Sequence, residues 1–147
     1  MATSNESHRR ETREEVETYL ARLKYAIETG ARISIQMDRP ADRNRPKEYT
    51  NEYTIHDLFP NENPNLAIKR ELKTLTVKNY LRTVKDLDYP NRSDMREFGK
   101  VYECDKEVYI KLRVEVLAPL DQPPLFVLSF HYAERPFSQE TFPYGND

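Results

Sequence analysis

The sequence predicts an α+β fold in which an N-terminal helix and two short helices pack on a small antiparallel sheet that ends in a three-stranded meander. Three observations indicate this class. Apolar residues near the N-terminus recur at helical spacing, apolar and polar residues alternate in the last third of the chain, and turn-forming residues separate these stretches. Helices that precede a run of consecutive strands are typical of α+β domains.

The first expected element is an amphipathic helix within residues 11–30. Its inward-facing residues at helical spacing are Val16, Tyr19, Leu20, Leu23, Ala26 and Ile27. Acidic residues in the first turns suit the helix dipole, and Gly30 stands where a glycine commonly ends a helix. Residues 1–10 are expected to be a disordered lead-in, since they contain almost no apolar residue.

The middle of the chain is expected to contain two short strands followed by two short helices. The strands are predicted at 31–37 and 48–55, and the helices at 65–73 and 76–85. Thr76 is a suitable N-cap for the second helix. The side chains expected to face inward there are Leu75, Val77, Tyr80, Leu81 and Val84.

Three consecutive strands are expected at 95–103, 107–117 and 124–131, and their short connections predict an antiparallel meander. The main domain is expected to span residues 11–137. Residues 138–147 are expected to form an irregular C-terminal tail.

The alternation is complete in residues 107–117. The residues predicted to face the core are Val108, Ile110, Leu112, Val114 and Val116, and those on the opposite face are Glu107, Tyr109, Lys111, Arg113 and Glu115. In the following strand the core residues are expected to be Phe126, Leu128 and Phe130, with Ser129 and His131 on the other face. A solvated antiparallel strand shows such a polar face whether or not it has a function, so alternation alone favours a structural interpretation.

Composition narrows the function classes. The 147 residues include ten tyrosines and six phenylalanines, too many for a disordered chain, and their number suits one domain. Cys104 is the single cysteine, which excludes an internal disulfide and suggests a reducing compartment. No apolar leader or membrane-length stretch occurs, so a cytoplasmic protein without a membrane partner is expected.

The net charge and the number and spacing of the histidines indicate which ligands are expected. The net charge of −2 argues against strong steering of a nucleic acid, although residues 66–135 carry a small basic excess that permits a local cationic face. The three histidines are dispersed and lack metal-ligand spacing, so neither a metal nor another cofactor is expected.

Residues 75–143 resemble the C-terminal half of the MqsR-type toxin family. The likeness rests on the order of LTVKNYLRTVKD, MREFGKVY, EVYIKLRVEV and FVLSFHYAERPF, with FPY close behind. In that family a helix leads into a sheet whose strands read as an aromatic-containing segment, a VYLKI-like segment and a V-S-F segment that ends in a basic residue. The N-terminal half agrees only as a helix followed by a strand.

The resemblance implies a RelE-like fold and a metal-independent endoribonuclease, the toxin of a type II toxin–antitoxin system. Such an enzyme cleaves mRNA, free or on the ribosome, with the RNA's own 2′-hydroxyl as nucleophile. The reaction needs a base for the 2′-hydroxyl proton, cations beside the phosphorane and an acid for the departing 5′-oxygen. The implied partners are RNA and a cognate antitoxin protein.

The catalytic residues that the resemblance implies are Tyr109, Lys111, Arg82 and His131. An imidazole ordinarily titrates near pH 6.5, so it serves as acid or base at about neutral pH. Further candidates for binding RNA phosphates are Lys100, Arg113 and Arg135. Where the family has a polar glutamine, this chain has Gly99, which permits close approach of a backbone or ligand or marks a β-bulge.

A second function class stays open. The same face, or the N-terminal helix, is equally suited to bind a partner protein, as in a non-catalytic regulatory or anti-defence module on a RelE-like scaffold, because a fold does not establish an activity. Growth arrest on expression without an antitoxin is the observation that separates the two classes.

Overall fold

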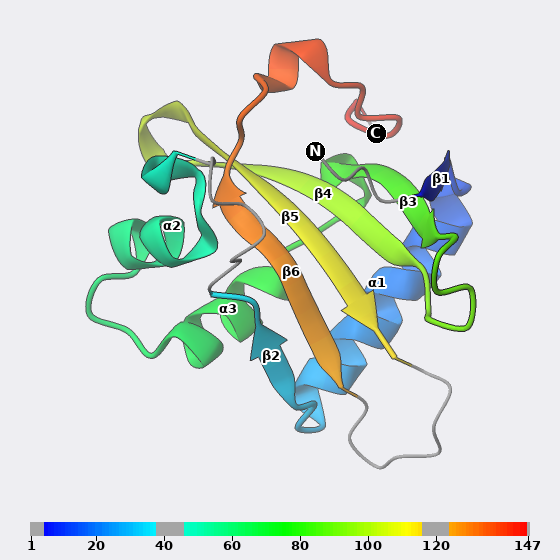
Figure 1. The fold of residues 1–147 in the computed structure, drawn as a ribbon, viewed down its shortest axis with the longest axis horizontal. Coiled ribbons are helices and arrows are strands. Elements are labelled where there is room, and N and C mark those ends of the chain that lie inside the picture. Colours follow the sequence, from blue (N-terminus) through cyan, green and yellow to red (C-terminus); the bar gives the residue numbers. More distant parts are fainter. Residues whose placement is uncertain (1–4, 38–45, 116–123, 147) are drawn as a thin grey trace.

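The computed structural model describes residues 5–37, 46–115 and 124–146 (Figure 1). Within these ranges the chain has an α+β fold, with three α-helices and one mixed six-stranded sheet of order β1-β3-β4-β5-β6-β2. The helices are α1 (Arg13–Glu28), α2 (Asn51–Leu58) and α3 (Pro64–Leu72). The strands are β1 (Glu6–Arg9), β2 (Ile33–Ile35), β3 (Tyr80–Asp86), β4 (Met95–Tyr102), β5 (Lys106–Val114) and β6 (Leu125–Tyr132).

The predicted fold class is confirmed at this level, and the sheet is larger than expected. The three-stranded meander is present, because β4, β5 and β6 pair in sequence and antiparallel. Strand β3 extends it on one side and carries β1 at the edge. Strand β2 lies parallel to β6 at the opposite edge, so the sheet is mixed.

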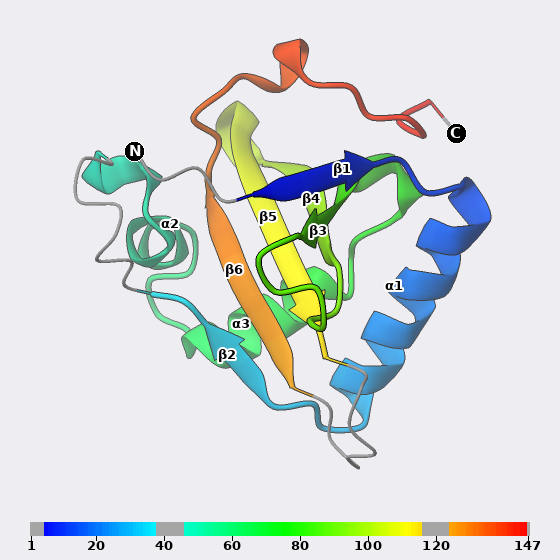
Figure 2. The ribbon, with the colours of Figure 1, turned by 45° about the vertical axis from the view of Figure 1, so that its right-hand side comes forward.

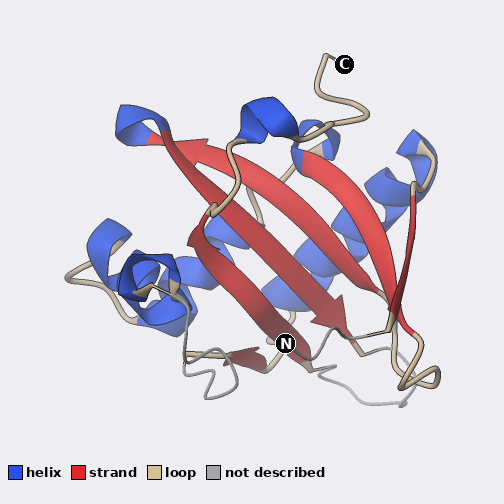
Figure 3. Ribbon diagram, turned by 45° about the horizontal axis from the view of Figure 1, so that its top comes forward, coloured by secondary structure: helices blue, strands red, loops and turns tan. Residues whose placement is uncertain are grey.

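The helices lie mainly on one side of the sheet, and the other face is open. In Figures 1 and 3, α1 and α3 lie behind the sheet, α2 flanks the edge near β6, and the C-terminal segment passes over one end of the open face. The largest fully buried side chains form the core and include Leu23, Ile55, Ile68, Leu72, Tyr80, Phe98, Ile110 and Phe130. No helix in the described parts of the chain is long and apolar enough to cross a membrane.

Helix α1 confirms the first predicted helix. Thr12 and Glu15 form a capping box at its N-terminus, and the helix ends before Gly30, whose φ of 92° a residue with a side chain rarely adopts. The apolar stripe packs as expected, with four of its members buried and Tyr19 and Leu20 partly buried against the core.

The N-terminal lead-in was expected to be disordered, and this is wrong for Glu6–Arg9, which form β1. The strand pairs antiparallel with β3 and is bent forward toward the open face (Figure 2). Just after the strand, the buried carboxylate of Glu11 accepts hydrogen bonds from Thr83 and Arg96, which ties the segment between β1 and α1 to β3 and β4. The polar sequence ESHR contains no apolar signal, so a strand held by long-range hydrogen bonds was not readable from it. Residues 1–4 lie outside the described residues.

Two middle elements differ from expectation and two agree. Residues 48–55 do not form a strand: after a short 3-10 turn, η2 (Lys47–Tyr49), Thr50 caps helix α2 by accepting a hydrogen bond from the Tyr53 amide. The strand predicted at 31–37 is present as the shorter β2. The helix predicted at 65–73 is confirmed as α3, with Asn63 as its N-cap and Pro64 in its first turn.

The helix predicted at 76–85 is wrong. Thr76 is a cap, but of the single 3-10 turn η3 (Val77–Asn79), after which the chain continues as β3. All five residues expected to face inward are nevertheless buried. Strand β3 has buried residues on both of its faces, so its apolar residues do not alternate with polar ones, and such a pattern is easily taken for a helix.

The prediction that Phe126 and Leu128 face the core is wrong, because the register of β6 shifts between Ser129 and Val127. Ser129 lies opposite Lys111, but Val127 lies opposite Leu112, so Leu128 is an extra residue. The shift reverses the facing of the residues before it: Leu125 and Val127 enter the core, whereas Phe126 and Leu128 stay partly exposed. Phe130 is buried as expected.

Asn51 holds this bulge. Its side chain donates a hydrogen bond of 3.1 Å to the Leu128 carbonyl and accepts one of 2.9 Å from the Phe130 amide, and it also donates to the Gln36 carbonyl. One buried amide at the start of α2 therefore joins β2 to the irregular part of β6.

The C-terminal tail contains the 3-10 turn η5 (Phe137–Gln139) and no other helix or strand in the described residues up to 146. It is nevertheless packed. Tyr144 stacks on Tyr80 with ring centroids 6.2 Å apart, and its hydroxyl donates to the Glu11 carbonyl. Tyr144 therefore packs against the core at the β3 edge, while Phe137 and Phe142 pack over Gly99 on the open face.

Candidate functional site

A pocket of about 280 Å³ opens on the exposed face of the sheet, between the ends of β5 and β6 and the C-terminal segment. Polar side chains dominate its lining. The lining residues are Tyr109, Lys111, Ser129, His131, Ala133, Glu134, Arg135, Phe137 and Glu140. Four predicted functional residues, Tyr109, Lys111, His131 and Arg135, are among them.

Strand pairing brings three of these side chains together. Tyr109 lies directly opposite His131, with ring centroids 5.4 Å apart, and Lys111 lies opposite Ser129. The expectation that Tyr109, Lys111 and His131 share one face is therefore confirmed. The bulge at Leu128 does not disturb this, because it comes before Ser129 in β6.

His131 is buried, with 4% of its surface exposed. Its Nδ1 lies 2.9 Å from the carbonyl oxygen of Tyr132, and a carbonyl only accepts, so Nδ1 carries the hydrogen. In the neutral ring Nε2 is then the acceptor nitrogen. This tautomer suits a residue that takes up a proton.

Glu97 stands at the centre of the site and was not anticipated. It is 4% exposed, lies opposite Lys111 in β5 and opposite Arg82 in β3, and forms an ion pair with Arg82. Its second carboxylate oxygen is 3.9 Å from Lys111 Nζ. Alternation within 95–103 places Glu97 on the same face as Gly99, so the sequence could have indicated that Glu97 faces the site. The burial of Glu97 depends on the packing around it and could not be predicted in this way.

The pKa of Tyr109 is raised far above that of an ordinary phenol. Burial is the main cause, and the negative charge of the neighbouring Glu97 carboxylate adds to it. Tyr109 therefore keeps its proton at neutral pH. It is equipped to donate a proton or a hydrogen bond and not to act as a phenolate base.

Arg82 reaches the site although its predicted helix is a strand. Burial alone would lower the pKa of Arg82, but the carboxylates of Glu97 and Glu140 outweigh it and raise the pKa, so the guanidinium stays charged. Its Nη2 lies 3.0 Å from Glu140 Oε1. Strand β3 places Arg82 beside β4, so the side chain joins the site through Glu97.

Carboxylates balance the cations of this site. Lys111 Nζ is 3.3 Å from Glu6 Oε2, which extends from β1, while Arg82 lies between Glu97 and Glu140. A phosphate group in the pocket thus has to compete with acidic side chains of the chain itself. Phosphate binding by Lys111 and Arg82 requires at least one of these contacts to open.

Lys100, a predicted phosphate-binding residue, does not line this pocket. It points to the helix-covered side of the sheet, where its Nζ contacts Thr74, lies 3.4 Å from Glu71 Oε1 and lies 5.0 Å from the centroid of the Tyr102 ring. Its cross-strand neighbour Val108 is a core residue. Lys100 comes three residues after Glu97 in β4. Because side chains alternate between the two faces of a strand, Lys100 lies on the face opposite to Glu97.

Arg113 lies on the open face, as its position in β5 predicted, but it does not line the pocket. Its guanidinium lies 4.7 Å from the ring centroid of Phe126, its cross-strand partner. Burial and the nearby Arg92 lower the pKa of Arg113. Arg135 does line the pocket, and it donates a hydrogen bond of 2.8 Å to the backbone oxygen of Gln139.

Gly99 permits close approach, and no bulge occurs there, since pairing of β4 with β5 is continuous from Arg96 to Tyr102. A Cβ at position 99 would lie 2.8 Å from the rings of both Phe137 and Phe142. The group that approaches is therefore the C-terminal segment of the chain itself. A side chain in place of Gly99 would push these two rings off the sheet.

Neither a metal cluster nor a known relative identifies the site. In the parts of the chain that the structure describes, no group of three or more histidine, cysteine, aspartate or glutamate side chains is placed to hold a metal ion. No protein-family model, no curated protein and no solved structure matches the chain. The function has to be inferred from the residues of the pocket.

Proposed function

We propose that the protein is a metal-independent endoribonuclease with a RelE-like arrangement, an mRNA-cleaving toxin of the MqsR type. The observation that carries the proposal is the direct opposition of Tyr109 and His131 across β5 and β6, in a polar pocket that Lys111 also lines. A proton donor and a proton acceptor stand side by side there, with a cation on the same face. These are the groups that cleavage by a 2′-hydroxyl requires.

The chemistry assigns one role to each ring. His131 Nε2 takes the proton of the 2′-hydroxyl while the 2′-oxygen attacks the phosphorus. The bond from phosphorus to the 5′-oxygen breaks, Tyr109 gives its proton to that oxygen, and a 2′,3′-cyclic phosphate remains. Solvent water then returns a proton to Tyr109 and removes one from His131. The raised pKa of Tyr109 keeps the phenol protonated when the reaction begins, as an acid has to be, but it also makes Tyr109 a weaker acid than an ordinary tyrosine.

Lys111 and Arg82 would stabilise the charge that develops on the phosphorane. Glu97 positions the two cations, since it contacts Arg82 and Lys111, and its charge helps to keep the Tyr109 phenol protonated. In this proposal the enzyme acts in the cytoplasm and a cognate antitoxin restrains it.

Cleavage of a defined RNA by the purified protein tests the proposal, with and without ribosomes and with EDTA. His131→Ala should lower the cleavage rate by about 10² to 10⁴, the usual contribution of a positioned acid or base. The melting temperature of the variant serves as the control for folding. Cleavage that EDTA abolishes, or an unchanged rate in the variant, would refute the proposed mechanism.

The charge balance of the site favours a second candidate, a non-catalytic module that binds a partner protein. Glu6, Glu97 and Glu140 neutralise the cations that RNA would need, and the net charge of the chain is −2. Expression without an antitoxin separates the two functions. An endoribonuclease toxin arrests growth, and the arrest disappears with His131→Ala, whereas a binding module is tolerated in both forms.

A further inference from the structure

A second pocket of about 430 Å³ adjoins the first, between the β1 and β3 edge of the sheet and the C-terminal segment. Four arginines line it, Arg9, Arg10, Arg82 and Arg135, and Glu140 is the one acidic side chain in its lining among the described residues. Arg135 and Glu140 line both pockets. The two pockets are therefore parts of one groove beneath the C-terminal segment, and we refer to this second part as the arginine groove.

The arginines of this groove are only partly neutralised. Arg9 pairs with Asp94 at 2.7 Å, and Arg135 donates to a backbone carbonyl. Arg10 is exposed, and within the described residues its side chain makes no ion pair. In a chain of net charge −2, so many guanidinium groups around one cavity form a local site for anions.

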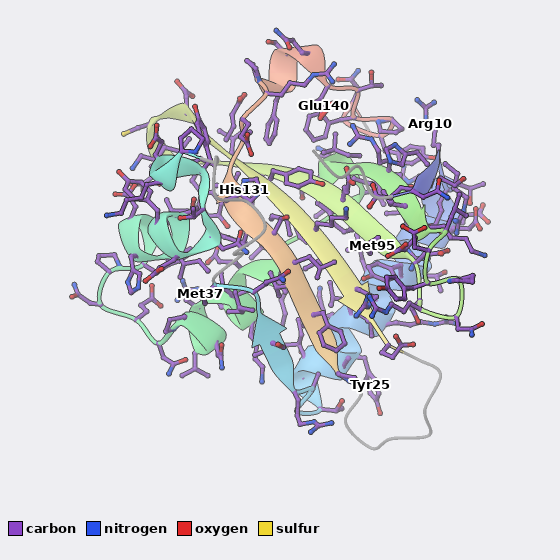
Figure 4. The ribbon with its side chains drawn as sticks, in the orientation of Figure 1. Arg10, Tyr25, Met37, Met95, His131 and Glu140 are labelled. Carbon is purple, nitrogen blue, oxygen red and sulfur yellow. The ribbon has the colours of Figure 1, made fainter. Side chains whose placement is uncertain are left out.

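Glu140 occupies the junction of the two pockets. Its carboxylate lies 3.0 Å from Arg82 Nη2, and Figure 4 shows it on the C-terminal segment above the open face, with Arg10 at the neighbouring edge. A carboxylate and a phosphate use the same forked geometry with a guanidinium. The position of Glu140 is thus one that a phosphate oxygen can take.

We propose that the arginine groove binds the backbone of single-stranded RNA next to the phosphodiester in the Tyr109 pocket, and that a phosphate replaces Glu140 at Arg82. This inference rests on the proposed function, since it extends the same substrate beyond the reacting group. Arg10 and Arg135 contact phosphates flanking the scissile one, and opening of the Arg82–Glu140 pair accompanies binding. The groove gives affinity without base specificity, because backbone contacts carry no sequence information.

Binding of a fully 2′-O-methylated single-stranded oligonucleotide tests this without cleavage, because the probe lacks the free 2′-hydroxyl. Affinity is measured by fluorescence anisotropy at several salt concentrations. The double variant Arg10→Ala/Arg135→Ala should bind about 10- to 100-fold more weakly, and the slope of log affinity against log salt should fall by about 1.4, or 0.7 for each lost contact. Arg32→Ala, which removes an exposed arginine beside β2 at the opposite edge of the sheet, should bind as the wild type does.

Glu140→Gln provides the second measurement. It keeps the size of the side chain and removes the competing charge, so it should bind the oligonucleotide several-fold more tightly than the wild type. Weaker binding would show that Glu140 does not compete with phosphate. Melting temperatures of all variants show whether each is folded.

Two outcomes separate this inference from the proposed function. Unchanged affinity and salt slope in the double variant would overturn the arginine groove even if the wild type cleaves RNA. Weakened binding in the double variant, with no cleavage of unmodified RNA by the wild type, would support the arginine groove and refute the proposed endoribonuclease activity. Absence of any binding by the wild type would also overturn the groove.

Discussion

The two faces of β3 and β4 carry clusters of the same residue types with different surroundings. On the helix-covered side, Glu11 accepts hydrogen bonds from Arg96 and Thr83, and Tyr80 accepts one from the Glu11 amide. On the open side, Glu97 pairs with Arg82 and lies near Tyr109, whose pKa its charge helps to raise. We call these the closed cluster and the open cluster.

The difference lies in what each cluster connects. The closed cluster joins the segment before α1 to β3 and β4, and Tyr144 of the C-terminal tail donates to the Glu11 carbonyl. The open cluster meets a pocket in which side chains are presented to an incoming group. Glu11 and Arg96 of the closed cluster also line a pocket, of about 500 Å³ beside α1, so access to a cavity does not separate the two clusters, and the distinction rests on the segments that each one joins.

Removal of one hydroxyl from each cluster gives the largest contrast. Tyr109→Phe should lower RNA cleavage by about 10² to 10⁴, because the proposed acid is lost. Tyr80→Phe should leave cleavage largely intact and lower the free energy of unfolding by about 1–3 kcal/mol, because the buried Glu11 amide loses its acceptor. Cleavage assays and denaturant unfolding of both variants check this. Equal loss of activity in the two variants would contradict the distinction.

Glu11→Gln should destabilise the fold by about 3 kcal/mol, because breaking a buried ion pair leaves Arg96 without its carboxylate. Urea unfolding measures this change. The exposed pair of Arg13 and Glu17 provides a matched control, and Glu17→Gln should change stability by less than about 1 kcal/mol.

The same pair predicts how stability depends on pH. Burial alone would raise the pKa of Glu11, but hydrogen bonds from Arg96 and Thr83 outweigh it, so the pKa in the folded state is lowered. The stabilisation is therefore present above the pKa of the unfolded chain, about 4.3, and is lost as pH falls through the folded pKa. Unfolding measured between neutral and acidic pH should show a smaller acid loss in Glu11→Gln than in the wild type.

Gly99→Ala tests the packing of the C-terminal segment over the open cluster. The new methyl group would meet Phe137 and Phe142 at 2.8 Å, so the C-terminal segment has to shift, at a cost of about 1–3 kcal/mol. Limited proteolysis should then cut the segment after His131 faster than in the wild type. Gly145→Ala is the control, since a Cβ there meets atoms no closer than 3.2 Å. Equal proteolysis of Gly99→Ala and the wild type would contradict the packing argument.

Lys100→Ala should have the smallest effect. Lys100 lies on the closed side, so cleavage and oligonucleotide binding should remain at the wild-type level. The loss of its contacts with Glu71 and Thr74 should lower stability by less than about 1 kcal/mol. A marked loss of RNA binding in this variant would show that the facing of β4 has been misassigned.

Which residues of β5 share a face follows from the local sequence of the strand alone. Apolar and polar residues alternate there without interruption, and in a strand this periodicity is a local property that needs no knowledge of neighbours. Tyr109 and Lys111 were therefore placed correctly, and α1 and the β4–β6 meander were recognised for the same reason. The pattern failed in β3, where both faces carry buried residues, and in β6, where one extra residue reverses the facing of Phe126.

The acidic side chains that surround Tyr109 and Lys111 are brought there by the folding of the whole chain. Glu6, Glu97 and Glu140 come from three separate segments, and their approach depends on strand register and on the path of the C-terminal tail. Both are set by long-range pairing and by the packing of Phe137 and Phe142 on Gly99. Local periodicity records which way a side chain points, whereas burial and charge balance depend on residues far away in the chain, and for this reason the acidic half of the site was not readable from the sequence.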